Sequence, residues 1–387
     1  MDIQILPGLL KGTVMAPPSK SHTHRLLIAA GLAGENSHIR HLAESEDIKA
    51  TRRCMEAMFS PVDLPLMDCG ESGSTLRFLI PLALVLRGGG RFTGQGRLME
   101  RPLEPYEDIC RKAGNYWNLS DNILTIEGSL SPGVFSLPGN VSSQFITGLL
   151  FALPLLDNDS EIHLTTPLES RNYVEMTLEV LHEFGIKAGW HNNLTLWVKG
   201  NQRYIPARVI VEGDWSQAAF WAAANFLNSV IQITGLNFTS SQGDRAVLSF
   251  ANQLSYPGDL MFDLSDYPDL VPPLAVMAAV RKGTTRFEHV ARLRLKESDR
   301  LASTVAMINA LGGRAEAEQD SLVIHGVPQL TGGTVDGVND HRIVMAAAIA
   351  AISCSGPVTI LGAQAVNKSY PAFFDEFQRL GGNCHVL

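Results

Sequence analysis

Six segments of the chain share one order of apolar and polar positions. In each, a short β-prone run meets a loop of Ser, Asn, Asp or Gly, and an apolar stretch rich in small residues follows. This order predicts a strand, a polar turn and the start of a buried helix, whose first backbone N–H groups can bind an anion. The segments begin at Val14, Met67, Phe135, Val209, Phe262 and Thr334.

The spacing of the six loops predicts two halves of three units each. The intervals between loops run short, long, long and then short, long, so the second half should begin near Glu212. In the long units an amphipathic helix ends at Gly and two β-prone runs follow, as in residues 173–200 and 300–327. The first unit of each half passes from helix straight to the next strand, so we expect each half to lack one hairpin.

Some of the predicted helices are apolar nearly all round. Residues 143–153, 217–227 and 343–353 have no polar face, which is typical of helices buried on every side. Their small residues allow close approach, so three such helices could pack around a pseudo-threefold axis in each half. The helix N-termini would then converge and concentrate partial positive charge.

Composition narrows the class of protein. The chain has 387 residues, of which 45% are hydrophobic and 18% charged, as in a globular protein large enough for two cores. A net charge of −8 and an isoelectric point near 5.8 argue against a nucleic-acid-binding protein, because such proteins need a basic surface. In a chain with this acidic composition, cations clustered in the turns are stronger candidates for a binding site.

The cysteines and the apolar runs bear on location. Five cysteines without C-x-x-C spacing argue against a disulfide framework or a zinc site and favour a reducing compartment. The first residues lack the pattern of a signal peptide, and apolar runs such as 78–86 are far shorter than the ~18 residues of a membrane span. We expect a soluble, cytoplasmic protein without a membrane or nucleic-acid partner.

Two of the loops could hold an anion. The segment PSKSHTHR puts Lys20, Ser21 and Arg25 at the opening of an apolar helix, and the alternative is a solvated basic turn. The segment VSSQF presents uncharged donors from residues 142–144, which suit a phosphate or a polyol. Ordinary N-capping explains one of these serines but not the set.

The segment LRLKESDRL is the densest charge cluster. If a helix starts at Lys296, then Lys296 and Arg300 share a face, and Glu297 lies beside Arg300. A surface salt-bridge network is the alternative. Asp269, in a helix-opening loop, could be tuned by nearby cations for proton transfer or could simply cap its helix. The Gly-rich segment RFTGQGRL matches no dinucleotide or P-loop pattern.

Nine motifs in order along the chain resemble the family of 5-enolpyruvylshikimate-3-phosphate synthases, the enolpyruvyl transferases of the shikimate pathway. They are PSKSHTHR, GESGSTLRF, RLMERP, VSSQF, ESRNYVEMT, YPDL, LKESDRL, NDHR and NKSYP, and they span residues 18–371. The chain departs from the family at Glu71 and Ser72, where many members have Asn and Ala, and at Arg292, where an Asn is common. His22 and His24 in the first loop are further departures.

The resemblance implies an α/β (α+β) fold in two domains. Each domain would contain three βαβαββ-type repeats around a pseudo-threefold axis, one of them shortened, and the two would form an inside-out α/β barrel. The first domain would be residues 13–211, and the second would be residues 1–12 with 212–387. The active site would lie in the cleft between them.

The resemblance also implies roles for residues that match the family motifs. Shikimate 3-phosphate would be bound by Ser21, Arg25, Ser142, Ser143, Ser170, Tyr173 and Lys296. Phosphoenolpyruvate would be bound by Lys20, Gly73, Arg101, Gln144, Arg300, Arg342 and Lys368. The proton-transfer residues would be Lys20, Asp269 and Glu297.

The implied reaction transfers the enolpyruvyl group of phosphoenolpyruvate to the 5-hydroxyl of shikimate 3-phosphate, in chorismate and aromatic amino acid biosynthesis. A monomer with no metal and no organic cofactor is expected to suffice. Three alternatives remain open. A UDP-N-acetylglucosamine enolpyruvyl transferase would carry a loop cysteine, and residues 91–102 contain none. A relative of RNA 3′-phosphate cyclases is disfavoured by the net negative charge of the chain. A non-catalytic phosphosugar-binding relative would be expected to lack the carboxylates at positions 269 and 297, and Asp269 and Glu297 are both present.

Overall fold

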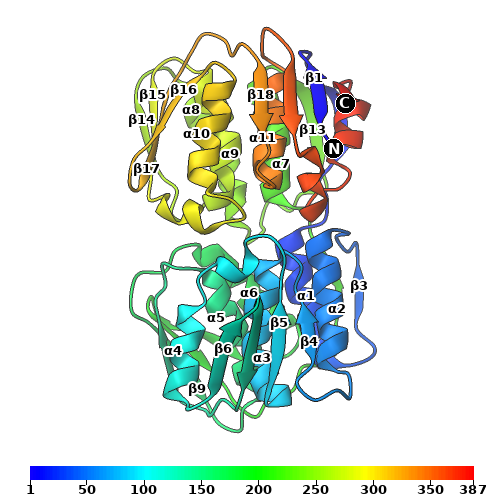
Figure 1. Ribbon diagram of the computed structural model, residues 1–387, viewed down its shortest axis with the longest axis vertical. Helices are drawn as coiled ribbons and strands as arrows, with labels where there is room; N and C mark the ends of the chain where they lie inside the picture. The colour runs from blue at the N-terminus through cyan, green and yellow to red at the C-terminus, as the bar shows by residue number, and fades with distance from the viewer. The chain divides into compact units, whose positions relative to one another are not determined.

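The computed structural model describes residues 1–387 and contains two compact units (Figure 1). Unit 1 comprises Met1–Pro18 and Glu212–Leu387, and unit 2 comprises Ser19–Val211. No helix combines the length and the apolar character that a membrane crossing requires.

Unit 2 contains six helices and three sheets. Its helices are α1 (Lys20–Ala33), α2 (Glu46–Met58), α3 (Gly73–Arg87), α4 (Glu104–Lys112), α5 (Ser143–Ala152) and α6 (Arg171–Glu183). One four-stranded sheet has the order β4 (Leu66–Asp68), β5 (Gly89–Thr93), β7 (Ile123–Glu127), β6 (Tyr116–Ser120). The other has the order β10 (Ala188–Asn192), β11 (Thr195–Val198), β9 (Ser160–Leu164), β8 (Val134–Leu137). The third sheet has only two strands, β12 (Arg208–Ile210) and β3 (His38–Arg40).

Unit 1 repeats this plan. Its helices are α7 (Trp215–Phe226), α8 (Val247–Leu254), α9 (Val271–Ala279), α10 (Arg300–Ala310), α11 (His341–Ala351) and α12 (Phe373–Arg379). One four-stranded sheet has the order β14 (Leu260–Asp263), β15 (Thr284–Glu288), β17 (Ser321–His325), β16 (Arg314–Ala317). The other has the order β18 (Gly333–Asp336), β19 (Val358–Leu361), β1 (Ile3–Leu6), β20 (Asn383–Val386). The two-stranded sheet pairs β13 (Val230–Thr234) with β2 (Lys11–Met15).

Each four-stranded sheet joins a parallel pair to an antiparallel pair. In three of these sheets the antiparallel pair is a hairpin, which follows α4, α6 or α10 in the chain. In the fourth, β1 and β20 from the two ends of the chain take the place of the hairpin. The two-stranded sheets have no such pair, which confirms the expected α/β fold with one shortened repeat in each half.

The first strands of the two shortened repeats are exchanged between the units. β2 precedes α1 in the chain but pairs with β13, whereas β12 precedes α7 but pairs with β3. Residues 13–18, which the sequence analysis assigned to the first domain, therefore lie in unit 1. The reason is the parallel pairing of β2 with β13, which extends to Met15.

The predicted buried helices form the cores. Every residue of α9 and α11 is buried, and α7, α9 and α11 pack against one another in unit 1 (Figure 1). Their alanines leave room for this close packing. In unit 2, α3 packs against α5, α5 against α6, and α6 against α1.

The helix starts follow the predicted turn chemistry. Five of the six turns end in an N-cap side chain that accepts a hydrogen bond from a helix N–H, as Ser and Asp typically do. These caps are Ser19, Ser72, Ser142, Asp214 and Asp340. The sixth helix, α9, instead follows a 3-10 turn at Pro268–Leu270 and has no side-chain cap. The side chain of Asp269 is therefore not used as a helix cap.

Candidate active site

Asp269 lies at the centre of an ionic cluster in unit 1. Its Oδ1 accepts a hydrogen bond from Arg300 Nη1 at 3.1 Å, and its Oδ2 accepts one from Arg342 Nη2 at 2.9 Å. Burial by itself raises the pKa of this carboxyl. The opposing charges of Arg342, Lys296 and Arg300 are stronger and hold that pKa well below its ordinary value.

Arg300 is the most deeply buried cation of this cluster. Its side chain is 1% exposed, and its Nε and Nη2 donate to Asp340 at 2.9 Å and 3.2 Å. Nη2 also donates to Glu297 Oε2 at 2.5 Å. Burial lowers the pKa of Arg300, but Asp340, Glu297 and Asp269 together raise it above its ordinary value. Arg300 therefore stays charged and holds Glu297 and Asp269 on one guanidinium.

The start of the helix in this segment differs from the prediction. Lys296 was expected to begin a helix, but it is extended, and α10 begins at Arg300. The reason is the N-cap, because Asp299 accepts a hydrogen bond from Ala302 N–H and so ends the loop. Lys296 still belongs to the cluster by charge. Burial lowers its pKa to about 8 against the opposing effect of Asp269.

The last two predicted cations of unit 1, Arg342 and Lys368, both contact the turn before α11. Arg342 is in the first turn of α11, where its N–H donates to the N-cap Asp340. Lys368 Nζ donates to the carbonyl of Asn339 at 2.6 Å, and Val338 and Asn339 both have positive φ. The turn thus brings Lys368 next to the residue that precedes Asp340.

In unit 2, Lys20 and Arg25 project from the first turns of α1. Lys20 Nζ forms an ion pair with Asp47 Oδ2 at 2.7 Å, and both side chains are largely buried. Arg25 is 3% exposed and donates to Thr177 Oγ1 and to the carbonyls of Ser21 and Tyr173 at 2.8–2.9 Å. Burial lowers its pKa to about 10, so it remains a cation. Arg25 thereby joins Ser21 to Tyr173.

Ser170 and Tyr173 open α6. Ser170 is the N-cap residue, is 2% exposed and has φ 58° and ψ 43°, a left-handed conformation that costs a non-glycine residue free energy. The Tyr173 ring lies 5.8 Å from the Arg25 guanidinium carbon. Buried backbone of this kind is most often found at binding and catalytic sites.

Gly73, Arg101 and Gln144 meet around one arginine that the sequence analysis did not select. Arg77 is 3% exposed, and it donates to Gln144 Oε1 at 2.9 Å and to the Pro102 carbonyl at 3.0 Å. A Cβ atom on Gly73 would lie 2.6 Å from Arg101 Nη1 and 2.9 Å from Arg77 Nη1. The glycine therefore allows two guanidinium groups to approach the N-terminus of α3.

The turn before α5 carries its three predicted residues as expected. Ser142 is the N-cap and accepts from the backbone N–H of Gln144, and Ser143 is the first helical residue. The Gln144 amide is fixed at both atoms, since its Nε2 also donates to Ser74 Oγ at 3.0 Å. Gln144 and Arg77 thus join the second and third loops of unit 2.

Four supporting residues were missed from sequence, namely Asp47, Arg77, Asp340 and Ser216, whose Oγ accepts a hydrogen bond from Arg342 Nη2 at 3.0 Å. Arg77 had a signal, because it is a cation inside an otherwise apolar helix within a motif already recognised. Asp340 lies within the motif NDHR, but only the arginine of that motif was selected as a site residue. Asp47 and Ser216 had no local signal, because their partners are distant in sequence.

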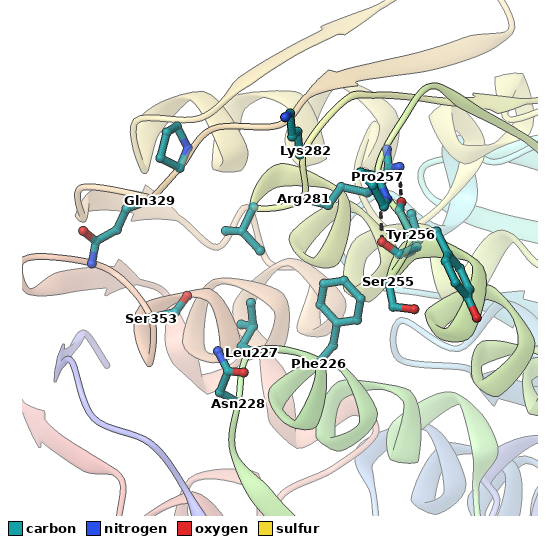
Figure 2. A pocket seen from close by; sticks show the side chains of 13 residues that line it. Phe226, Leu227, Asn228, Ser255, Tyr256, Pro257, Arg281, Lys282, Gln329 and Ser353 are labelled. Atoms are coloured by element: carbon teal, nitrogen blue, oxygen red, sulfur yellow. Dashed lines mark hydrogen bonds between the residues drawn. The ribbon is translucent and has the colours of Figure 1, made fainter.

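One cavity lies away from all of these residues. It has a volume of about 420 Å³ and is bordered by the C-terminal ends of α7, α8 and α9, and Figure 2 shows its lining. Arg281 is the buried cation there, and it donates to the backbone carbonyls of Leu254 and Tyr256 at 3.1 Å and 2.7 Å. Because these hydrogen bonds of Arg281 go to backbone carbonyls, we do not include this cavity in the candidate active site. No group of three or more His, Cys, Asp or Glu side chains is arranged to hold a metal ion.

Comparison with known proteins places the whole chain in one group. A sequence model described as EPSP synthase (3-phosphoshikimate 1-carboxyvinyltransferase) matches residues 6–377. The 3-phosphoshikimate 1-carboxyvinyltransferase of Clostridium acetobutylicum is 42% identical over 419 residues, covering 99% of this chain and 98% of that protein. The protein of the same name from Clostridium novyi is 41% identical over 424 residues, covering 98% of each. Both alignments exceed the length of this chain, so the relatives carry residues that have no counterpart here.

Solved structures agree on the fold. The EPSP synthase of Acinetobacter baumannii matches with a TM-score of 0.80 at 21% identity over 100% of both chains. The enolpyruvyl transferase NikO of Streptomyces tendae matches with a TM-score of 0.77 at 16% identity, covering 99% of this chain and 98% of that one. At these identities the likeness concerns the fold alone.

Proposed function

The chain belongs to the EPSP synthase family, and we propose that the residues assembled in its two units carry out that family's reaction. The protein is a 3-phosphoshikimate 1-carboxyvinyltransferase, which transfers the enolpyruvyl group of phosphoenolpyruvate to the 5-hydroxyl of shikimate 3-phosphate and releases phosphate. Its UDP-N-acetylglucosamine-dependent counterpart is not favoured by the comparisons.

The observation that carries the residue assignment is the ionic cluster of Asp269, Arg300 and Arg342. Both substrates are phosphorylated carboxylates, so several negative charges must be brought together and offset by fixed cations. Arg300 and Arg342 are buried at 1% and 4% exposure and are anchored by carboxylates, so they are preorganised for this task.

The proposed binding residues follow from the two groups of polar side chains. In unit 2, shikimate 3-phosphate is held by residues Ser21, Arg25, Ser142, Ser143, Ser170 and Tyr173, and Lys296 of unit 1 joins them. Phosphoenolpyruvate is held in unit 2 by Lys20, Gly73, Arg101 and Gln144. In unit 1 it is held by Arg300, Arg342 and Lys368.

In the first chemical step, Asp269 accepts the proton of the substrate 5-hydroxyl. The hydroxyl oxygen forms a bond to C2 of phosphoenolpyruvate, while Glu297 or Lys20 donates a proton to the C3 methylene carbon. The product of this step is a tetrahedral intermediate. In the second step a C3 proton is removed, the C2–C3 double bond forms again, and the bond from C2 to the phosphate oxygen breaks.

Binding of phosphoenolpyruvate also activates the base. Arg342, Lys296 and Arg300 hold the pKa of Asp269 low, which makes its carboxylate a weak base. Anionic groups of the substrate neutralise the same two guanidinium groups, so the pKa of Asp269 rises toward the working pH. The base therefore gains strength when its substrate is present.

The test is phosphate release by the purified protein. Phosphate should appear from phosphoenolpyruvate only when shikimate 3-phosphate is added, and parallel reactions should replace this acceptor by UDP-N-acetylglucosamine. No release with shikimate 3-phosphate would refute the assignment. Release with UDP-N-acetylglucosamine alone would favour the alternative reaction.

We also propose that the enzyme works as a monomer in the cytoplasm. All five cysteines are buried and none forms a disulfide; Cys54 Sγ and Cys69 Sγ, 3.9 Å apart, share a thiol hydrogen bond. Free thiols so close together are typical of a reducing compartment. Light scattering on the eluting protein would test the monomer, and fractionation of the source cells would test the location.

A further inference from the structure

The start of α7 with the two residues before it, residues 213–217, has no ligand-binding role in the resemblance, yet its serine contacts Arg342. We propose that Ser216 is a positioning residue that holds Arg342 in place for phosphoenolpyruvate. The inference rests on the proposed function, in which Arg342 binds that substrate.

The contact has a defined direction. Arg342 Nη2 donates to Ser216 Oγ at 3.0 Å and to Asp269 Oδ2 at 2.9 Å. The single hydroxyl proton of Ser216 is donated to Asp214 Oδ1 at 2.6 Å, so its oxygen is left as an acceptor for the guanidinium. Asp214, Ser216 and Arg342 are 3%, 6% and 4% exposed, which shields this chain of hydrogen bonds from water.

The turn itself is held independently of Arg342. Asp214 Oδ1 caps α7 by accepting from Gln217 N–H at 3.0 Å. Gln242 accepts from Trp215 N–H at 3.0 Å and donates to the Gly213 carbonyl at 2.9 Å. The position of Ser216 Oγ is therefore set by its own turn.

Ser216 differs from Asp269, the other side chain that binds Arg342 Nη2, because its hydroxyl is uncharged. The carboxylate holds Arg342 in the empty site, but it competes with an anionic substrate for the same guanidinium. Ser216 accepts a hydrogen bond without adding negative charge, so it keeps Arg342 in place while the substrate binds. Since Asp214 already caps α7, the helix start does not need the Ser216 hydroxyl.

The experiment compares Ser216→Ala with Ser229→Ala. Ser229 is a matched control because it is 7% exposed, lies in the same unit, and has a hydroxyl that accepts from Leu10 N–H at 3.0 Å, away from the site. We expect Ser216→Ala to raise the KM for phosphoenolpyruvate about tenfold, since one hydrogen bond to a charged group is lost. The KM for shikimate 3-phosphate should change less than twofold.

Two further variants separate positioning from folding. Ser216→Thr keeps the hydroxyl and should restore most of the affinity for phosphoenolpyruvate, whereas Ser216→Cys keeps the size but accepts weakly and should not. A looser Arg342 should also raise the pKa of Asp269 and shift the acid limb of kcat/KM to higher pH.

The outcomes distinguish the two proposals. If the wild type is active and Ser216→Ala has the same KM for phosphoenolpyruvate, the positioning role is refuted while the proposed function stands. Equal rises in both KM values, with a loss of melting temperature matching that of Ser229→Ala, would also overturn it by showing a structural role. A wild type that releases no phosphate would overturn the proposed function and this inference with it.

Discussion

Replacing Asp269 by Asn tests the proposed base with little change in shape. The substitution keeps the size of the side chain and removes its ability to take up a proton. The two hydrogen bonds from Arg300 and Arg342, at 3.1 Å and 2.9 Å, would face one carbonyl oxygen and one NH2 group. The variant therefore separates proton transfer from most of the packing.

The expected magnitude follows from two effects of different size. Loss of a general base lowers the rate by roughly 10²- to 10⁴-fold, so we expect kcat to fall about 10³-fold. The NH2 group placed against a guanidinium costs about 1–3 kcal/mol of stability, which lowers the melting temperature by several degrees. Removing one carboxylate leaves the cluster more positive, so binding of the anionic substrates should be kept or strengthened.

Phosphate release in a single turnover measures the chemical step, and calorimetry measures binding of shikimate 3-phosphate. Asp299→Asn is the matched control, because it makes the same change in another carboxylate of unit 1, the N-cap of α10, and Asn caps helices equally well. The control should stay within twofold of the wild type. A kcat for Asp269→Asn within tenfold of the wild type would refute the assignment of the base.

Three more predictions follow from the geometry. Burial lowers the pKa of Lys296 to about 8, so the side chain is charged below that pH and neutral above it. We therefore expect kcat/KM for shikimate 3-phosphate to fall as the pH rises through 8. In a pH profile, Lys296→Arg should remove this fall. Arg77→Lys cannot serve both Gln144 and the Pro102 carbonyl, so steady-state kinetics should give a KM for phosphoenolpyruvate about tenfold higher; an unchanged KM would contradict the role of Arg77 in orienting Gln144. Gly73→Ala would place a Cβ 2.6 Å from Arg101 Nη1, the end of a flexible side chain. It should weaken phosphoenolpyruvate binding while the melting temperature stays within about 2 °C, and a large thermal shift would instead indicate backbone strain.

Local patterns along the chain were enough to predict the repeated units and to propose the site residues. A Ser or Asp beside an apolar run is a local signal, because the cap bonds a helix N–H only two or three residues away. For that reason the polar loops that end in Ser19, Ser72 and Ser142 were correctly predicted to open helices. The missing hairpins were also visible, because two of the intervals between loops were short.

The start of α10 was predicted incorrectly, because two local signals in that segment disagree. The charges of Lys296 and Arg300 suggested a shared helix face, but Asp299 caps α10 and leaves Lys296 outside it. The exchange of β2 and β12 between the shortened repeats was also hidden, since strand pairing depends on hydrogen bonds between segments more than 160 residues apart in the chain.

The partners that hold the cations could be found only in the folded protein. The bonds from Arg77 to Gln144, from Arg300 to Asp340 and from Arg342 to Ser216 join residues 67, 40 and 126 positions apart. No periodicity connects such positions, because they meet only when core helices pack and bring their N-termini together. The sequence therefore identified the charges, and the packing of the helices selected the carboxylates, amides and hydroxyls that orient them.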